Sequence, residues 1–264
     1  MVAKQGWSVH AQCSDPRPTT TDPPLESAEI GPINVGIVGV GRWGQNLLRV
    51  VPRLDGARLA GMADPRTALK SLAIPNSPDL SALLADPTIH AVAIASPSEL
   101  HAVHAEEALA AGRHVFVEKP LALSSAADEA LCAQAARANR CLMVGHIMRY
   151  DPSIVRMRGL VLEGALGRLE SAALVRTRQR VSVDDPWWSL APHDLSLLEF
   201  VLDSPIRSLA CVTTDRGIRA QVRLESGVEA QVQVAFGEAK RSEVVVSGTS
   251  GSVIGRLRES PASR

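Results

Sequence analysis

The first half of the chain alternates short apolar runs with longer stretches in which apolar residues recur at helical spacing. The apolar runs are rich in β-branched residues and predict strands at 33–38, 58–63, 90–95, 113–117 and 141–145. The periodic stretches predict helices at 43–51, 65–73, 79–85, 99–111 and 124–138. This alternation predicts an α/β fold with a doubly wound parallel sheet and helices on both faces. Ligands of such sheets bind at the carboxyl ends of the strands.

The pattern changes after Pro152. Helices are expected at 153–163 and 190–202, with a loop at 179–187. Strands are expected near 168–178, 206–213, 218–224, 228–235 and 242–247. Apolar and polar side chains alternate from Val228 to Val234, which is typical of a sheet with one covered face. We therefore predict a second α/β domain with an open, mostly antiparallel sheet.

Residues 1–31 contain many prolines among Ser, Thr and Asp and show little apolar periodicity. This composition predicts a disordered Pro-rich extension. The folded part then divides into a nucleotide-binding domain at 32–150 and a second domain at 151–264.

The first predicted strand runs directly into a glycine-rich turn. Gly39, Gly41 and Gly44 give the pattern G-x-G-x-x-G, with Arg42 and Trp43 before the last glycine. One glycine allows the tight turn, one lets the backbone approach a pyrophosphate, and one lets the helix pack against the strand. The first amides of the following helix then face the phosphates. The flanking strand and helix favour a dinucleotide site, and the alternative is a glycine turn used only for packing.

An acidic residue follows the second predicted strand. Asp64 lies twenty residues beyond Gly44, where a carboxylate accepts the hydroxyls of an adenosine ribose and repels a 2′-phosphate. The spacing predicts NAD as the cofactor, with NADP less favoured. Arg66 is close enough in sequence to weaken this preference.

Composition excludes several classes of partner and location. The chain has 28 basic and 28 acidic residues, so no overall charge attracts it to nucleic acid or to anionic lipid. No apolar run is long enough to span a membrane, and the N-terminus lacks the apolar segment of a signal peptide. The cysteines show no zinc-site spacing, so free thiols and a cytoplasmic location are expected.

Glu118, Lys119 and Pro120 follow the strand that is predicted at 113–117. The proline holds Lys119 extended and raises the chance of a cis peptide bond. An ammonium group near an oxidised nicotinamide would have a lowered pKa, which suits a general base. The alternative for this tripeptide is a surface turn.

Three further positions carry candidate chemistry. His193 is expected to open the helix at 190–202, where an imidazole suits proton transfer with a hydroxyl; the alternative is a capping or packing histidine. Arg149 suits a carboxylate or phosphate of a substrate, or alternatively an interdomain salt bridge. His101 and His104 lie on a helix face that should be solvated, which argues against a metal site.

With these residues in view, the chain from about Ile33 onward resembles the glucose-fructose oxidoreductase/inositol dehydrogenase/MocA (Gfo/Idh/MocA) family of nicotinamide-dependent sugar oxidoreductases. The resemblance rests on these motifs: Gly39–Gly44, Ala63-Asp64, Ala95-Ser96-Pro97 with His101, Glu118-Lys119-Pro120, Gly145-His146 with Arg149, and Pro192-His193-Asp194.

The resemblance implies an NAD(P)-binding Rossmann domain followed by a substrate domain whose open sheet forms homo-oligomers. It implies that Lys119 and His193 face the substrate carbon that exchanges hydride with the nicotinamide, and that Glu118 helps to hold the nicotinamide ribose. It also implies the following cofactor-binding residues: Gly39, Gly41, Arg42, Trp43, Gly44, Asp64, Ser96, Pro97, His101, Glu118 and Lys119. The implied substrate-binding residues are Lys119, Arg149, Trp188 and His193.

Two departures from the family pattern are visible. Ser189 occupies the position, one helical turn before His193, where the family usually has an aspartate. A serine cannot supply the charge that orients the imidazole, unless Asp184, Asp185 or Asp194 substitutes. The chain also ends soon after the turn at 248–253, whereas family members generally continue, which predicts a shortened sheet.

The segment from Trp188 to Ser196 most resembles the branch that oxidises the 3-hydroxyl of nucleotide-linked amino-sugar acids. The expected activity is therefore hydride transfer between nicotinamide and a secondary hydroxyl of a sugar or nucleotide sugar. The rival hypothesis is a catalytically impaired relative that binds the nucleotide without turnover, and a nonfunctional fragment is a third interpretation.

Overall fold

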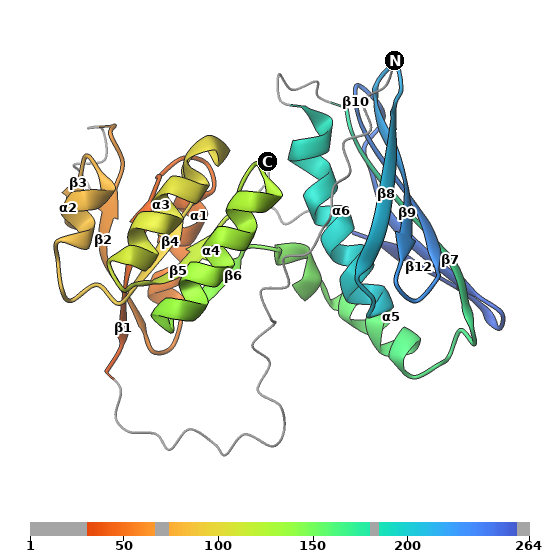
Figure 1. Ribbon diagram of the computed structural model, residues 1–264, viewed down its shortest axis with the longest axis horizontal. Helices are drawn as coiled ribbons and strands as arrows, with labels where there is room; N and C mark the ends of the chain where they lie inside the picture. The colour runs from red at the N-terminus through yellow and green to blue at the C-terminus, as the bar shows by residue number, and fades with distance from the viewer. Residues whose placement is uncertain (1–30, 67–73, 180–184, 258–264) are drawn as a thin grey trace. The chain divides into compact units, whose positions relative to one another are not determined.

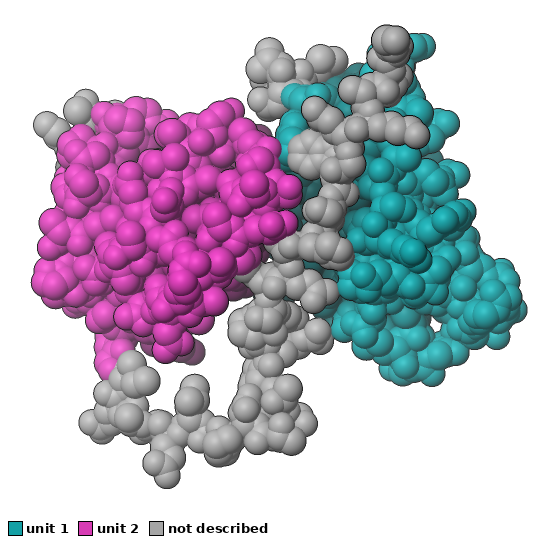
Figure 2. Space-filling model, in the orientation of Figure 1, with its two compact units in different colours: residues 1–9, 146–264 teal, residues 10–145 magenta. Residues whose placement is uncertain are grey.

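The computed structural model of the chain describes residues 31–66, 74–179 and 185–257. These residues form two compact units that divide between Gly145 and His146 (Figure 2). The part up to Gly145 is called the N-terminal unit, and the part from His146 onward is called the C-terminal unit. Each unit has its own six-stranded sheet and its own buried core.

The N-terminal unit contains a parallel sheet with the strand order β3-β2-β1-β4-β5-β6 (Figure 1). Its strands are β1 (Ile33–Val38), β2 (Ala57–Ala63), β3 (Asn76–Ser77), β4 (Ala91–Ile94), β5 (His114–Val117) and β6 (Leu142–Val144). The order turns back between β1 and β4, which is the place where doubly wound sheets bind their ligands.

Helices cover both faces of this sheet. They are α1 (Gly44–Val50), the 3-10 helix η1 (Val51–Arg53), α2 (Leu80–Leu84), α3 (Ser98–Ala110) and α4 (Ser125–Ala138). Neighbouring residues on one strand point to opposite faces, so Ile37 packs in the core beside α1 whereas Val38 packs in the core that contains residues of α3 and α4. The strands β1, β2, β4 and β5 are mostly apolar because both faces of the sheet are buried.

The C-terminal unit contains a second sheet with the strand order β12-β11-β7-β10-β9-β8. Its strands are β7 (Leu169–Arg178), β8 (Ile206–Thr213), β9 (Gly217–Leu224), β10 (Glu229–Phe236), β11 (Arg241–Gly248) and β12 (Gly251–Arg256). Only the β7–β10 pairing is parallel, and the other four pairings are antiparallel. Its helices are the 3-10 helix η3 (Ile147–Tyr150), α5 (Pro152–Leu162) and α6 (Pro186–Leu202).

One face of the second sheet is covered by helices. Helix α6 contacts β7, β9 and β10, and α5 contacts β12. Buried residues of α6, such as Leu197 and Val201, pack in one core with Val222 and Val232 of the sheet. The residues that alternate with this buried set, including Gln221 and Gln231, are exposed on the other face.

The predicted fold class is confirmed: a parallel doubly wound sheet is followed by an α/β unit with a mostly antiparallel sheet. Three expectations are corrected. The short strand β3 was not predicted, and the turn expected at 248–253 is the tip of a hairpin that continues as β12. Helix α6 starts at Pro186, because Asp185 caps it by accepting a hydrogen bond from the amide of Trp187.

Some expectations fall on residues that are not described. These are the Pro-rich extension up to residue 30, most of the helix predicted at 65–73, and Asp184. Cys141 and Cys211 are free thiols, as predicted. Cys132 is disulfide-bonded, so the expectation of free cysteines is wrong for this residue.

Candidate active site

The glycine turn after β1 has the geometry that a dinucleotide requires. Gly39 has a φ of 81°, and a Cβ there would lie 2.5 Å from the backbone nitrogen of Ser96. A Cβ at Gly44 would lie 2.0 Å from the carbonyl oxygen of Gly39, so only glycine lets the helix start this close to the turn. Gly41, in contrast, faces open space with no atom within 4 Å of a built Cβ. The turn therefore leaves room for a close ligand at the position where a pyrophosphate approaches the backbone.

Asp64 is linked to this turn. Its buried carboxylate accepts a hydrogen bond from the amide of Val40 at 2.7 Å. It also accepts hydrogen bonds from the backbone and the guanidinium group of Arg66. These bonds, above all those from the Arg66 side chain, hold the pKa of the Asp64 carboxyl well below its usual range. The acid at the end of β2 is thus ionised and fixed beside the glycine turn.

Ser96, Pro97 and His101 join the loop after β4 to the loop after β5. Pro97 precedes the first turn of α3. The His101 side chain is buried, with Nε2 at 2.9 Å from the carbonyl oxygen of Ser96 and Nδ1 at 2.6 Å from that of Pro120. The expectation of a solvated helix face is therefore wrong for His101. Both ring nitrogens face carbonyl groups of the chain, so this histidine positions two strand-end loops.

Glu118 and Lys119 follow β5 directly, and the Lys119–Pro120 peptide bond is cis, as the sequence suggested. Glu118 is buried, which raises the pKa of its carboxyl to about 6, although the charge of Lys119 opposes this rise. A Cβ at Gly145 would lie 3.3 Å from the Glu118 carboxylate, so the glycine at the end of β6 makes room for this side chain.

Asp128 of α4 supports the loop that follows Lys119. Its carboxylate is hydrogen-bonded to the backbone of Ala122, and burial raises the pKa of this carboxyl to about 6. Sequence reasoning missed this residue, because an acid in the first turn of a helix is ordinarily a dipole partner.

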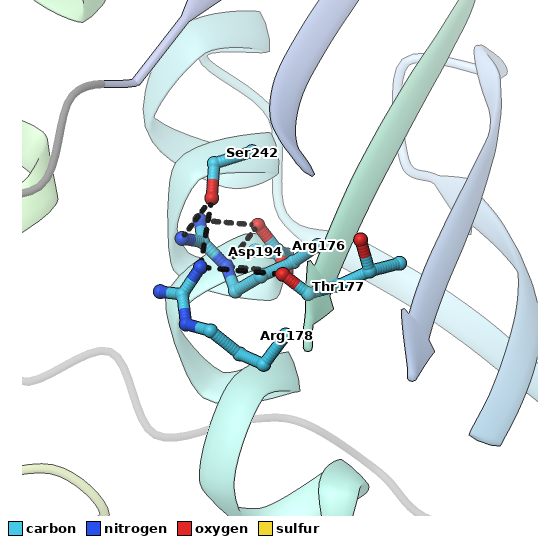
Figure 3. A network of polar contacts seen from close by, with 5 residues as sticks. All are labelled: Arg176, Thr177, Arg178, Asp194 and Ser242. Carbon is cyan, nitrogen blue, oxygen red and sulfur yellow. Dashed lines mark hydrogen bonds and ion pairs between the residues drawn. The ribbon is translucent and has the colours of Figure 1, made fainter. Parts of the chain in front are cut away.

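In the C-terminal unit, His193 lies in the middle of α6, not at its start. The next residue, Asp194, is buried and forms a bidentate ion pair with Arg176 of β7 (Figure 3). Arg178 and Ser242 complete the network at this end of β7 and β11. Asp185 is used as the N-terminal cap of α6. Asp185 and Asp194, two of the acids proposed to replace the missing aspartate at position 189, therefore have other partners.

Arg149 lies on η3 and contacts α6. Its Nε donates a hydrogen bond to the hydroxyl of Ser196 at 2.7 Å, and its guanidinium carbon lies 5.8 Å from the centre of the Phe200 ring. Arg149 thus contacts Ser196 and Phe200, which belong to the same unit as Arg149. Trp188 and His193 occupy the same helix, so α6 carries both of these predicted substrate-binding residues.

The structure thus gathers the predicted cofactor residues of the N-terminal unit at the carboxyl ends of β1, β2, β4 and β5. Within the described ranges, no group of three or more His, Cys, Asp or Glu side chains has the arrangement of a metal site. A search of the same ranges for helices long and apolar enough to cross a membrane finds none.

An open glycine turn, an ionised acid at the end of the second strand, and helices on both faces of a parallel sheet define a dinucleotide-binding Rossmann unit. Residues 33–146 match the family model GFO_IDH_MocA, described as "Oxidoreductase family, NAD-binding Rossmann fold". The N-terminal unit is therefore similar to the NAD-binding domain of this oxidoreductase family.

Curated relatives cover most of the chain. Inositol 2-dehydrogenase 1 of Saccharopolyspora erythraea is 27% identical over 232 residues, which is 83% of this chain and 69% of the relative. 1,5-Anhydro-D-fructose reductase of Ensifer adhaerens is 31% identical over 197 residues, which is 66% of this chain and 59% of the relative.

Solved structures share the fold of both units. GenD2 from gentamicin A biosynthesis, in complex with NAD, superposes with a TM-score of 0.80 and 24% identity, covering 86% of this chain and 73% of that one. The WlbA dehydrogenase of Bordetella pertussis, in complex with NADH and UDP-GlcNAcA, gives a TM-score of 0.79 and 22% identity, covering 85% of this chain and 74% of that one.

Proposed function

We propose that this protein is an NAD-dependent dehydrogenase that acts on a secondary hydroxyl of a sugar or sugar derivative. The observation that carries the proposal is the glycine turn, open at Gly41 and linked through Val40 to the ionised Asp64. These groups fit the pyrophosphate and the adenosine ribose of NAD. Bound NAD would supply the hydride acceptor for the alcohol carbon. The match to the family model and the sugar-related names of the relatives support the same class of reaction.

Lys119 is the proposed acid-base residue. It lies at the end of β5, on the edge of the sheet where the glycine turn also lies. As a base, its side chain would take the proton of the substrate hydroxyl while the alcohol is oxidised, and it would return the proton in the reverse direction. Glu118, buried beside Lys119, is proposed to hold the nicotinamide ribose. His193 of the C-terminal unit is proposed as the second group at the hydroxyl.

The proposed substrate is a nucleotide-linked amino-sugar acid that is oxidised at its 3-hydroxyl. Trp188 and His193 on α6 support this proposal, as does the fold shared with WlbA, which was solved with UDP-GlcNAcA. Arg149 would bind the sugar carboxylate, because a guanidinium group recognises carboxylates in a bidentate manner. A homo-oligomer formed through the exposed face of the second sheet is part of the same proposal, and light scattering of the purified chain tests it.

Replacement of Lys119 tests the mechanism. Lys119→Ala should lower kcat about 100-fold or more, a typical general acid-base contribution, while the affinity for NADH stays nearly constant. Lys240→Ala, at an exposed lysine between β10 and β11, is the control for loss of a positive charge. Unchanged turnover of Lys119→Ala with the best substrate of a panel of free and nucleotide-linked sugars would refute the mechanism.

A non-catalytic relative that senses NAD(H) or a sugar is the second candidate function. Ser189 in place of an acid favours it, together with the engagement of Asp194 by Arg176 and of Asp185 by the helix start. This candidate predicts that the purified chain binds NADH but forms no NADH from NAD with any sugar of the panel. Robust turnover with one substrate would exclude it.

A further inference from the structure

Arg66 donates hydrogen bonds to the carboxylate of Asp64, which is the group proposed to bind the ribose of the cofactor. Its Nε lies 2.8 Å from Oδ1 of Asp64, its terminal nitrogen lies 2.7 Å from Oδ2, and its amide nitrogen lies 2.9 Å from Oδ1. Val40 donates the fourth hydrogen bond, to Oδ2. A carboxylate can accept about four hydrogen bonds. Asp64 accepts this full number, and Val40 and Arg66 of the same chain donate all four.

Only the side-chain bonds of Arg66 can be released without disturbing the backbone. The Arg66 side chain is 60% exposed, whereas that of Asp64 is 3% exposed. Because the guanidinium group lies in water, its bonds to Asp64 can be exchanged for bonds to water and to a ligand at a smaller cost than those of a fully buried pair. When a ribose hydroxyl binds Asp64, the guanidinium group must therefore move away, and it remains tethered two residues from the carboxylate. There the guanidinium group lies beside the substituent on the 2′-carbon of the ribose, which is a hydroxyl in NAD and a phosphate in NADP.

We propose that Arg66 sets the cofactor preference of this protein, in two ways. It competes with the ribose hydroxyls of NAD for Asp64, and once displaced it binds the 2′-phosphate of NADP, which Asp64 alone would repel. A guanidinium group suits this task, because it pairs with phosphate in a bidentate manner. The protein should accordingly bind both cofactors with little discrimination. This inference rests on the proposed cofactor site and adds a selectivity residue to it.

The test compares the dissociation constants of NADH and NADPH for the full chain, measured by the fluorescence of the reduced nicotinamide. Arg66→Ala should raise the ratio of the NADPH constant to the NADH constant by about tenfold or more, the factor for loss of one hydrogen bond to a charged group. NADH itself should bind equally well or more tightly. Arg66→Lys keeps the charge but loses the bidentate geometry, and it should give an intermediate ratio. Arg53→Ala, at an exposed arginine of η1, is the control for charge and should leave the ratio unchanged.

The outcomes separate this inference from the proposed function. A ratio that stays within about twofold in Arg66→Ala, with tight binding of NADH, overturns the role of Arg66 and leaves the dehydrogenase proposal intact. Tighter binding of NADPH in that variant also overturns it. Binding of neither cofactor by the unaltered chain refutes the dinucleotide site itself, and with it both proposals.

Discussion

The buried ion pair between Arg176 and Asp194 gives the sharpest prediction about stability. Both side chains are at most 2% exposed, and three nitrogen–oxygen contacts of 2.7 to 3.1 Å join them (Figure 3). Loss of one partner from such a pair costs about 3–5 kcal/mol, because a charge is left buried without its counter-ion. Arg178 is close enough to compensate in part, so we expect about 3 kcal/mol for Arg176→Met.

The assay is urea unfolding followed by tryptophan fluorescence. The chain has four tryptophans, so replacement of Trp7 and Trp43 by phenylalanine leaves only Trp187 and Trp188 of α6, which report on the C-terminal unit. The midpoint should fall in Arg176→Met while the slope of the transition stays constant.

Two further variants complete the test of this ion pair. The double variant Arg176→Met with Asp194→Leu should recover to within about 1 kcal/mol of the starting protein, because no charge remains buried. Arg223→Ala removes an exposed ion pair with Glu229 in the same unit and should cost at most about 1 kcal/mol. An Arg176→Met variant no less stable than Arg223→Ala would refute the reasoning.

Three other predictions concern the proposed site. Gly44→Ala forces a Cβ to within 2.0 Å of the Gly39 carbonyl oxygen, so the turn must open, and calorimetric titration should show at least a tenfold weaker affinity for NADH, or about 1.4 kcal/mol. Glu118 has a pKa of about 6 against an ordinary value of 4.5, so its stabilising contribution is present below pH 4.5 and is lost as the pH rises through 6. The free energy of unfolding should therefore fall between pH 5 and pH 8 by about 1.3 kcal/mol more in the unaltered chain than in Glu118→Gln. Ser189→Asp places a carboxylate one helical turn before His193 and should raise kcat about tenfold; a constant rate in stopped-flow measurements would contradict this expectation.

The sequence predicted the parts of the fold that repeat a local pattern. The apolar run at Ile33–Val38, the glycines after it and the acid after β2 lie close together in sequence, so their spacing defines the dinucleotide site without coordinates. The predicted start of α6 at residue 190 was wrong, because Asp185 and Pro186 supply the actual start four residues earlier.

Other features depend on pairs that no local pattern reveals. His101 was expected on a solvated helix face, and only the folded loops show that its ring lies between two carbonyl groups. Arg176 lies in a strand that mixes polar and apolar residues, and its partner lies on α6, eighteen residues later. β3 spans two residues, which is too short for any periodicity.

The position of β7 has a consequence for synthesis on the ribosome. It is the first strand of its sheet to be made, but both of its neighbours, β10 and β11, come near the end of the described chain. Until they are translated, β7 exposes unpaired amide and carbonyl groups together with the cationic Arg176. The second sheet can therefore close only at a late stage of translation, and the nascent chain is open to misassociation and chaperone capture during that interval.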